Sequence, residues 1–182
     1  MSLRLVVGPM FAGKTTEIQA VIKRYKFVGR QVLVLKPAMD NRYSGDSAIV
    51  SHDQVSLEAV SVHALKDALE LAEFKTASVI AIDEAQFFTG LRKFIEASIE
   101  LGKDVIVVGL DGDAEGHPFT EVLELVAIAD SVDKKTALCV HCGSPAMFTC
   151  SLKKRENRLE VGGADMYEPT CRKHRHGHTV KC

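Results

Sequence analysis

A glycine-rich segment near the N-terminus constrains this chain more than any other feature. Residues 8–15 read GPMFAGKT and match G-x-x-x-x-G-K-[ST], the phosphate-binding P-loop. The apolar run 3–7 precedes the segment, and the residues after it carry apolar side chains at helical spacing, which predicts strand, loop and helix. In that context backbone N–H groups and the helix N-terminus face phosphate oxygens. We expect Lys14 to reach the β- and γ-phosphates and Thr15 to ligate Mg²⁺. A chance glycine turn is the alternative, which this context disfavours.

Length and composition suit one domain with a small appendage. The 182 residues are 46% hydrophobic, and the formal net charge of −1 gives no general attraction to nucleic acid or to a membrane. The chain shows no signal peptide and no membrane-spanning run, so we expect a soluble, cytoplasmic protein. Four of the five cysteines follow residue 138, which favours metal binding over disulfides.

Apolar strands alternate with amphipathic helices along the rest of the chain. This pattern is typical of an α/β fold with a mostly parallel sheet and helices on both faces. We predict strands at 31–36, 59–62, 79–83 and 104–110, and helices at 63–74, 91–101 and 119–129. Gly29 is a plausible helix terminator, and the polar segment 37–53 is expected to be a loop. From residue 139 short strands and cysteines predominate, so we predict a main domain of residues 1–138 and a second of residues 139–182.

Two adjacent carboxylates, Asp83 and Glu84, follow the predicted strand that contains residues 79–82. In P-loop proteins a strand-end Asp commonly holds Mg²⁺. A second carboxylate beside a γ-phosphate can accept the proton of an attacking hydroxyl or orient a water molecule. A solvated turn is the alternative, and the P-loop favours the chemical roles. No G-x-G-x-x-G follows a strand and no N-K-x-D motif occurs, which argues against a dinucleotide site and against a GTPase.

Two short-spaced pairs of ligand residues lie in the second part of the chain. Three thiolates and one imidazole would complete a closed, structural tetrahedral zinc site, here from Cys139, Cys142, Cys171 and His174. His176 and His178 follow closely, so the identity of the fourth ligand stays open. Independent reduced cysteines are the alternative. Cys150 and Cys182 fall outside the pattern, and Cys150 is expected to be a small apolar filler.

Taken together, these motifs and several others resemble the type II thymidine kinase family, which has cellular, bacterial and poxviral members. The segments that carry the resemblance occur in one order and span essentially the whole chain. They are the P-loop, DNRYS at 40–44, SHD at 51–53, DEAQFF at 83–88, LDG at 110–112, PF at 118–119, GGADMY at 162–167 and the two zinc pairs. The DEAQFF and GGADMY segments are more specific to the family than the P-loop.

The resemblance implies a P-loop ATP-binding kinase domain and a zinc-binding lasso domain. It implies transfer of the ATP γ-phosphoryl group to the 5′-hydroxyl of thymidine, giving dTMP, with deoxyuridine as a second substrate, and a homotetrameric assembly. Glu84 occupies the position of the general base. Asp83 and Thr15 match residues on the Mg²⁺ side. The residues that it assigns to the ATP side are Gly8, Pro9, Met10, Phe11, Ala12, Gly13, Lys14, Thr15, Asp40, Arg42, Asp83 and Gln86.

The resemblance also implies a nucleoside site closed by a lasso that precedes Gly162. The residues that it assigns to this site are Met10, Phe87, Leu110, Ala114, Phe119, Thr149, Val161, Gly162 and Tyr167. The chain departs from the family at two positions: Ala114 stands where Phe is usual, and Ser151 stands where Arg is usual. Residues 153–158 are also unusually charged. These departures concern base affinity and substrate breadth. Because Ala114 replaces a large aromatic side chain, we hypothesise a roomier nucleoside site than in most of the family.

Other functions stay open at the level of the sequence. Another P-loop ATPase with a zinc knuckle would share both motifs, and a weakly active relative could bind nucleotide as a sensor. The presence of both Lys14 and Glu84 argues against an inactive protein. A simple zinc-binding module would leave the P-loop unexplained.

Overall fold

The fold is built on a six-stranded sheet whose neighbouring strands all pair in parallel. The computed structural model describes residues 1–39, 48–50, 56–153, 158 and 160–175. The strand order across the sheet is β5-β2-β6-β7-β1-β8. The strand bounds are β1 Leu3–Val7, β2 Val32–Pro37, β5 Val60–Val62, β6 Val79–Ile82, β7 Asp104–Gly109 and β8 Ser131–Lys134.

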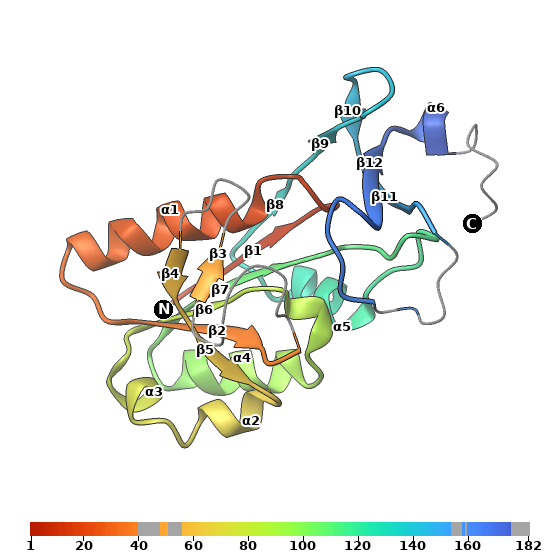
Figure 1. Ribbon diagram of the computed structural model, residues 1–182. Coiled ribbons are helices and arrows are strands. Elements are labelled where there is room, and N and C mark those ends of the chain that lie inside the picture. The colour runs from red at the N-terminus through yellow and green to blue at the C-terminus, as the bar shows by residue number, and fades with distance from the viewer. Residues whose placement is uncertain (40–47, 51–55, 154–157, 159, 176–182) are drawn as a thin grey trace.

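Helices cover both faces of the sheet, as the sequence predicted. Helix α1, Lys14–Phe27, lies on one face, and the opposite face is covered by α2 Leu65–Ala68, α3 Ala72–Thr76, α4 Leu91–Glu100 and α5 Thr120–Leu123 (Figure 1). Short 3₁₀ helices occupy Ala85–Phe87 and Glu124–Ala127. Within the described part of the chain, no helix has both the length and the apolar character needed to cross a bilayer.

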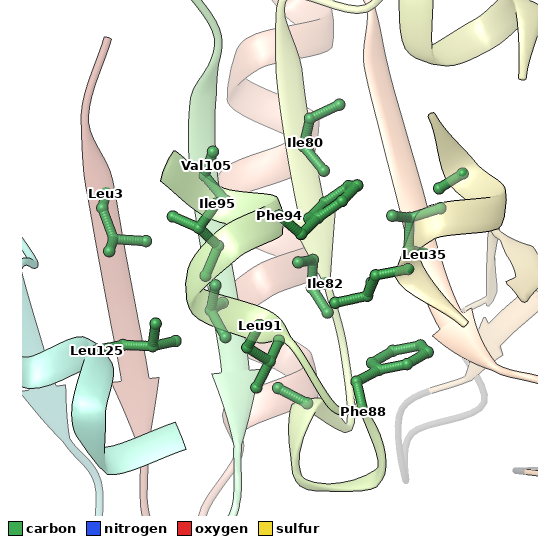
Figure 2. Packing of buried hydrophobic residues seen from close by; sticks show 14 of the residues in the cluster. Leu3, Leu35, Ile80, Ile82, Phe88, Leu91, Phe94, Ile95, Val105 and Leu125 are labelled. Atoms are coloured by element: carbon green, nitrogen blue, oxygen red, sulfur yellow. The ribbon is translucent and has the colours of Figure 1, made fainter. Parts of the chain in front are cut away.

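Strand side chains alternate between the two faces, so the sheet contributes to two cores. On the α1 face, Val6 packs with Ile18 and Ile22. On the other face, Leu3 and Leu5 belong to a larger cluster that includes the apolar side of α4, and Figure 2 shows this packing. All five of these side chains are fully buried. The two cores hold the carboxyl ends of the strands in fixed register, and the site described below is built on those ends.

The P-loop helix α1 is fixed at both of its ends. At its C-terminus Gly29 has φ 76°, and its N–H donates to the Lys26 carbonyl at 3.0 Å. The Arg30 N–H donates to the Tyr25 carbonyl at 3.0 Å, which completes a Schellman motif and confirms Gly29 as the terminator. Near its N-terminus Glu17 pairs with Arg4 of β1 at 2.8 Å and with a lysine that follows β8 at 3.1 Å.

The second part of the chain forms small antiparallel ladders beside the main sheet. β9 Ala137–Leu138 pairs with β10 Pro145–Ala146, and β11 Phe148–Ser151 pairs with β12 Tyr167–Thr170. Helix α6, Arg172–Arg175, follows β12. Cys150 of β11 is 8% exposed, as expected of a filler, and its thiol lies 3.1 Å from the Thr170 hydroxyl. The domain boundary after residue 138 stays a prediction.

Four elements differ from the sequence prediction. Strand β3, Ala48–Val50, pairs with β4, Ser56–Glu58, although it lies in a segment predicted to be a loop. The helix predicted over 63–74 is divided into α2 and α3, because Leu71 takes an extended backbone with φ −66° and ψ 141°. The helix predicted over 119–129 is shorter, since it tightens into a 3₁₀ turn after α5. Strand β8 was not predicted, because only one of its four residues is apolar.

Candidate active site

The P-loop connects β1 to α1, as the sequence predicted. An ideal Cβ atom on Gly8 would lie 2.4 Å from the backbone carbonyl oxygen of Lys135, so only glycine fits there. Lys14 folds back over the loop, and its Nζ atom donates to the Pro9 carbonyl at 2.6 Å. The loop lines a pocket of about 50 Å³ together with the residues at the end of β6. Its backbone has positive φ at Gly8 (148°), Phe11 (63°) and Gly13 (71°).

Two carboxylates stand at the carboxyl end of β6 beside this pocket. Asp83 is 4% exposed and accepts a hydrogen bond from the Thr15 hydroxyl at 3.4 Å. Glu84 has φ 51°, a left-handed backbone that costs a non-glycine residue energy and is found preferentially at functional sites. Gln86 donates to the Glu84 carboxylate at 2.5 Å and accepts from the Leu110 N–H at 3.0 Å. Gln86 therefore fixes the Glu84 carboxylate relative to the end of β7.

A second cavity, of about 30 Å³, adjoins the P-loop pocket, and Met10 and Leu110 contribute to the walls of both. The Met10 N–H donates to the Thr149 hydroxyl at 2.9 Å, which ties the P-loop to β11. Most of the nucleoside-site residues predicted from the sequence meet at this cavity. They are Met10, Phe87, Leu110, Ala114, Phe119, Thr149, Gly162 and Tyr167, together with Gln86 from the ATP-side set.

Five residues predicted for the ATP and nucleoside sites are not placed in either cavity. Gly8 and Pro9 belong to the P-loop, but they are not among the described residues that line the two cavities. Val161 is half-buried, and it is not among the described residues that line the second cavity. Asp40 and Arg42 lie outside the described residues. Ala114 is 4% exposed and packs with Met10 and Tyr167, so neighbouring side chains take up the space beside it in this conformation.

Three charged residues at the second cavity were not predicted as site residues: Asp113, Arg158 and Glu160. The Arg158 guanidinium pairs with the Asp113 carboxylate at 2.8 Å, and the Tyr167 hydroxyl donates to the Glu160 carbonyl at 3.0 Å. The unusual charge of residues 153–158 was the signal that could have identified Arg158. Asp113 gave no signal of its own, because its role depends on a partner distant in sequence.

The four predicted metal ligands come together at the ends of β9 and β12. Their ligand atoms all lie within 4.8 Å of one another. The Cys142 and Cys171 sulfurs are 3.8 Å apart, and His174 Nδ1 lies 3.3 Å from the Cys171 sulfur and 3.6 Å from the Cys139 sulfur. Zn–S bonds of about 2.3 Å in a tetrahedron place sulfurs about 3.8 Å apart, so the cluster fits a zinc ion.

The local chain geometry explains why these ligands meet. The Gly143 N–H donates to the Cys139 carbonyl at 2.8 Å, and Gly143 has φ 69°, which closes a tight turn around the first pair. The His174 N–H donates to the Cys171 carbonyl at 3.1 Å in the first turn of α6. Hydrogen bonds from Ser144 lower the pKa of the Cys142 thiol to about 7, which favours the thiolate that a metal requires. His176 and His178 lie outside the described residues.

The parallel sheet, the loop between β1 and α1 and the carboxylates at the end of β6 define a nucleotide-binding protein of the P-loop class. Among solved structures, the flagellar accessory protein FlaH from Methanocaldococcus jannaschii aligns with a TM-score of 0.54 and 16% identity. That alignment covers 93% of this chain and 86% of the FlaH chain, and it shows likeness of fold alone.

The chain belongs to the thymidine kinase family, whose family model matches residues 1–175. It is 39% identical to the cytosolic thymidine kinase of Homo sapiens over 93% of this chain and 71% of that protein. It is 37% identical to the thymidine kinase of Myxoma virus (strain Lausanne) over 94% of each chain. It is 43% identical to a thymidine kinase of Oryza sativa subsp. japonica over 94% of this chain and 65% of that protein. These findings confirm the resemblance inferred from the sequence.

Proposed function

We propose that the chain transfers the γ-phosphoryl group of ATP to the 5′-hydroxyl of thymidine, giving dTMP, with deoxyuridine as a second substrate. One observation carries this proposal beyond the family relationship. The P-loop pocket and the second cavity share Met10 and Leu110, so a phosphate donor and a nucleoside would meet at that shared wall. Glu84 lines the P-loop pocket beside the same wall.

Glu84 is the proposed general base, which accepts the proton of the 5′-hydroxyl during phosphoryl transfer. A base must lie within hydrogen-bond reach of the proton that it removes. The bond from Gln86 supports this role, since it holds the Glu84 carboxylate at a fixed position beside the P-loop pocket. Gln86 can do so because it is itself anchored to the Leu110 N–H. We therefore assign Gln86 to positioning the base.

The P-loop residues are proposed to bind the ATP phosphates through backbone N–H groups and through Lys14. Lys14 would exchange its present bond to the Pro9 carbonyl for contacts with phosphate oxygens. Thr15 and Asp83 are the proposed holders of Mg²⁺, and their side-chain oxygens lie 3.4 Å apart. When bound, Mg²⁺ would neutralise charge that develops on the phosphate oxygens. We also propose that Asp40 and Arg42 contribute to this site.

The cysteine and histidine cluster is proposed to hold a structural zinc. Four protein ligands leave no open position for chemistry. The cluster joins the β9–β10 turn to the start of α6, and β12 between them carries Tyr167 into the nucleoside cavity. Zinc would therefore stabilise one wall of that cavity. We further propose a cytoplasmic, homotetrameric enzyme of nucleotide salvage.

The proposal is tested with radiolabelled ATP and a panel of nucleosides. We expect labelled monophosphate from thymidine and deoxyuridine. The Glu84→Gln variant should lower kcat by about 10²–10⁴-fold while ATP binding is retained, because an amide cannot accept the proton. Near-normal turnover in the variant would remove the assignment of the base. Absence of thymidine phosphorylation by the wild-type protein would refute the proposed function.

A further inference from the structure

A buried carboxylate, Asp113, organises the loop of residues 111–118 that forms one wall of the nucleoside cavity. The Asp113 side chain is 1% exposed. Its Oδ1 atom accepts hydrogen bonds from the N–H groups of Glu115 at 3.0 Å and His117 at 2.8 Å. The Asp113 N–H donates to the His117 carbonyl at 2.9 Å, which closes the loop. Ala114 belongs to this loop, and Phe119 directly follows it.

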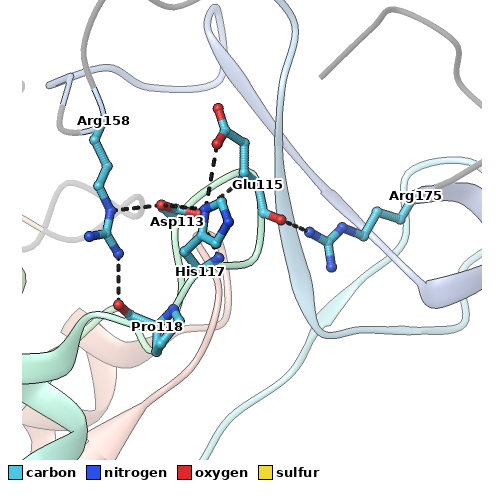
Figure 3. Close-up of polar contacts among 6 residues, drawn as sticks. All are labelled: Asp113, Glu115, His117, Pro118, Arg158 and Arg175. Atoms are coloured by element: carbon cyan, nitrogen blue, oxygen red, sulfur yellow. Dashed lines mark hydrogen bonds and ion pairs between the residues drawn. The ribbon is translucent and has the colours of Figure 1, made fainter.

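Arg158, which precedes Gly162 in the chain, makes three contacts with described residues in and next to this loop, shown in part in Figure 3. Its Nε atom donates to Oδ2 of Asp113 at 2.8 Å, and its guanidinium donates to the Pro118 carbonyl at 2.7 Å. The guanidinium carbon also lies 5.2 Å from the centroid of the Phe119 ring, within the range of a cation–π contact. Of these residues, Arg158, Asp113 and Phe119 line the cavity itself.

The electrostatic environment makes Arg158 the principal counter-charge for this carboxylate among the described residues. Burial alone would raise the pKa of Asp113, but the hydrogen bonds from the His117 backbone and from Arg158 outweigh it and hold that pKa below its ordinary value. The His117 ring is the other basic group near the carboxylate, at 3.6 Å from Oδ2, and its side chain is 67% exposed. Loss of Arg158 would leave a buried carboxylate without its closest cation, which is costly.

We propose that Arg158 is a positioning residue for the nucleoside. Its ion pair with Asp113 holds the 111–118 loop, and with it Ala114, in the arrangement that binds the pyrimidine nucleoside. The inference rests on the proposed function, since it concerns the nucleoside cavity of that reaction. The three contacts of Arg158 with described residues are to Asp113, Pro118 and Phe119, so we expect its loss to affect the nucleoside cavity more than the ATP side.

Arg175 provides a matched control on the same loop. It donates a hydrogen bond to the Glu115 carbonyl from α6, on the side away from Arg158 (Figure 3), and its guanidinium lies 4.3 Å from the centroid of the Phe148 ring. Arg175 does not line the described cavity. The same substitution at the two arginines therefore separates general support of the loop from positioning of the nucleoside.

The test compares Arg158→Met with Arg175→Met in the full chain, with KM for thymidine, KM for ATP, kcat and thermal unfolding as readouts. We expect Arg158→Met to raise the thymidine KM about tenfold, the size of effect expected for losing a hydrogen bond to a charged partner. The ATP KM and kcat should stay within about twofold, because uniform nucleoside binding is what is lost. Arg158→Lys, which keeps the charge, should recover part of the loss, and Arg175→Met should resemble wild type.

A second variant keeps the test decisive if Arg158→Met folds poorly. Asp113→Asn retains an oxygen for the two loop N–H groups but removes the charge, and it should raise the thymidine KM without a further rise in the double variant with Arg158→Met. The inference would be overturned if the thymidine KM stayed unchanged in these variants, or if the ATP KM and kcat changed as much as the thymidine KM. In either case, thymidine phosphorylation by the wild-type protein would leave the proposed function standing. Wild type that fails to phosphorylate thymidine overturns the proposed function, and this inference with it.

Discussion

Gly8→Ala is the substitution for which the structure gives the most direct expectation. The new Cβ would lie 2.4 Å from the Lys135 carbonyl oxygen. The oxygen is a main-chain atom and the Cβ is bonded directly to the main chain, so no side-chain rotation relieves the clash. Gly8 also has φ 148°, a region that alanine rarely adopts. Overpacking costs about 1–3 kcal/mol and backbone strain a similar amount, so we expect a loss of about 2–6 kcal/mol. At roughly 2–4 °C per kcal/mol, Tm should fall by at least about 4 °C.

The control for this substitution is Gly90→Ala at the N-terminus of α4. Gly90 has φ 72°, and a Cβ there meets nothing within 4 Å, so this variant carries backbone strain of about 1–2 kcal/mol without a clash. Calorimetry should show a clearly larger Tm decrease for Gly8→Ala. In a coupled kinase assay only Gly8→Ala should raise the ATP KM, because displacement of Lys135 or of the loop moves the P-loop backbone. Equal Tm decreases with unchanged ATP KM would refute this reasoning.

Two further substitutions test the metal cluster and a buried lysine. His174→Ala should abolish zinc binding measured by elemental analysis of protein purified without chelator, whereas full occupancy would transfer the fourth ligand to His176 or His178. Lys103 is 6% exposed, its Nζ donates to two backbone carbonyls, and burial lowers its pKa below 10.5. Between the folded and unfolded pKa values the unfolded chain binds more protons, so the contribution of this lysine to stability rises with pH up to about 10.5. The Tm difference between wild type and Lys103→Met should therefore shift in favour of wild type as the pH is raised toward 10.5, and a pH-independent difference would contradict the argument.

The elements and residues that follow from local pattern could be predicted from the sequence. The P-loop context, the buried strands β1, β6 and β7 and the adjacent carboxylates Asp83 and Glu84 all depend on neighbouring residues. The two pairs of cysteine and histidine residues proposed to bind zinc follow from ligand spacing for the same reason. Strand β8 was missed, because its pairing with β1 depends on contacts such as the 2.6 Å ion pair between Arg4 and Asp133, which no local window contains.

The coupling between distant segments explains the rest of what was missed. The Thr149 hydroxyl meets the Met10 N–H across 139 positions of the chain, and Arg158 meets Asp113 across 45. Neither residue of such a pair is distinctive alone, since an aspartate after a glycine and an arginine in a charged run are both ordinary surface features. Only the fold places them together, so the charged wall of the proposed nucleoside cavity could not be predicted from spacing.

Ala114 shows how the structure changes an expectation drawn from the sequence. An apolar cavity of about 150 Å³ is large enough to hold a benzene ring. The cavity that Ala114 lines measures about 30 Å³, so a phenylalanine ring at this position must displace its neighbours or fill the nucleoside site. The sequence alone suggested that Ala114→Phe would raise thymidine affinity or narrow the substrate range.

On the geometry of this conformation, we expect Ala114→Phe to overpack the cavity at a cost of about 1–3 kcal/mol and to raise the thymidine KM. Shortening Arg158, which lines the same cavity, should relieve that cost, so the double variant with Arg158→Ala should be less destabilised than the sum of the two single variants. Thermal unfolding of the four proteins and thymidine KM measurements check both statements. Additive Tm changes would show that the ring and the Arg158 side chain do not compete for space, and a lower thymidine KM in Ala114→Phe would restore the expectation from the sequence.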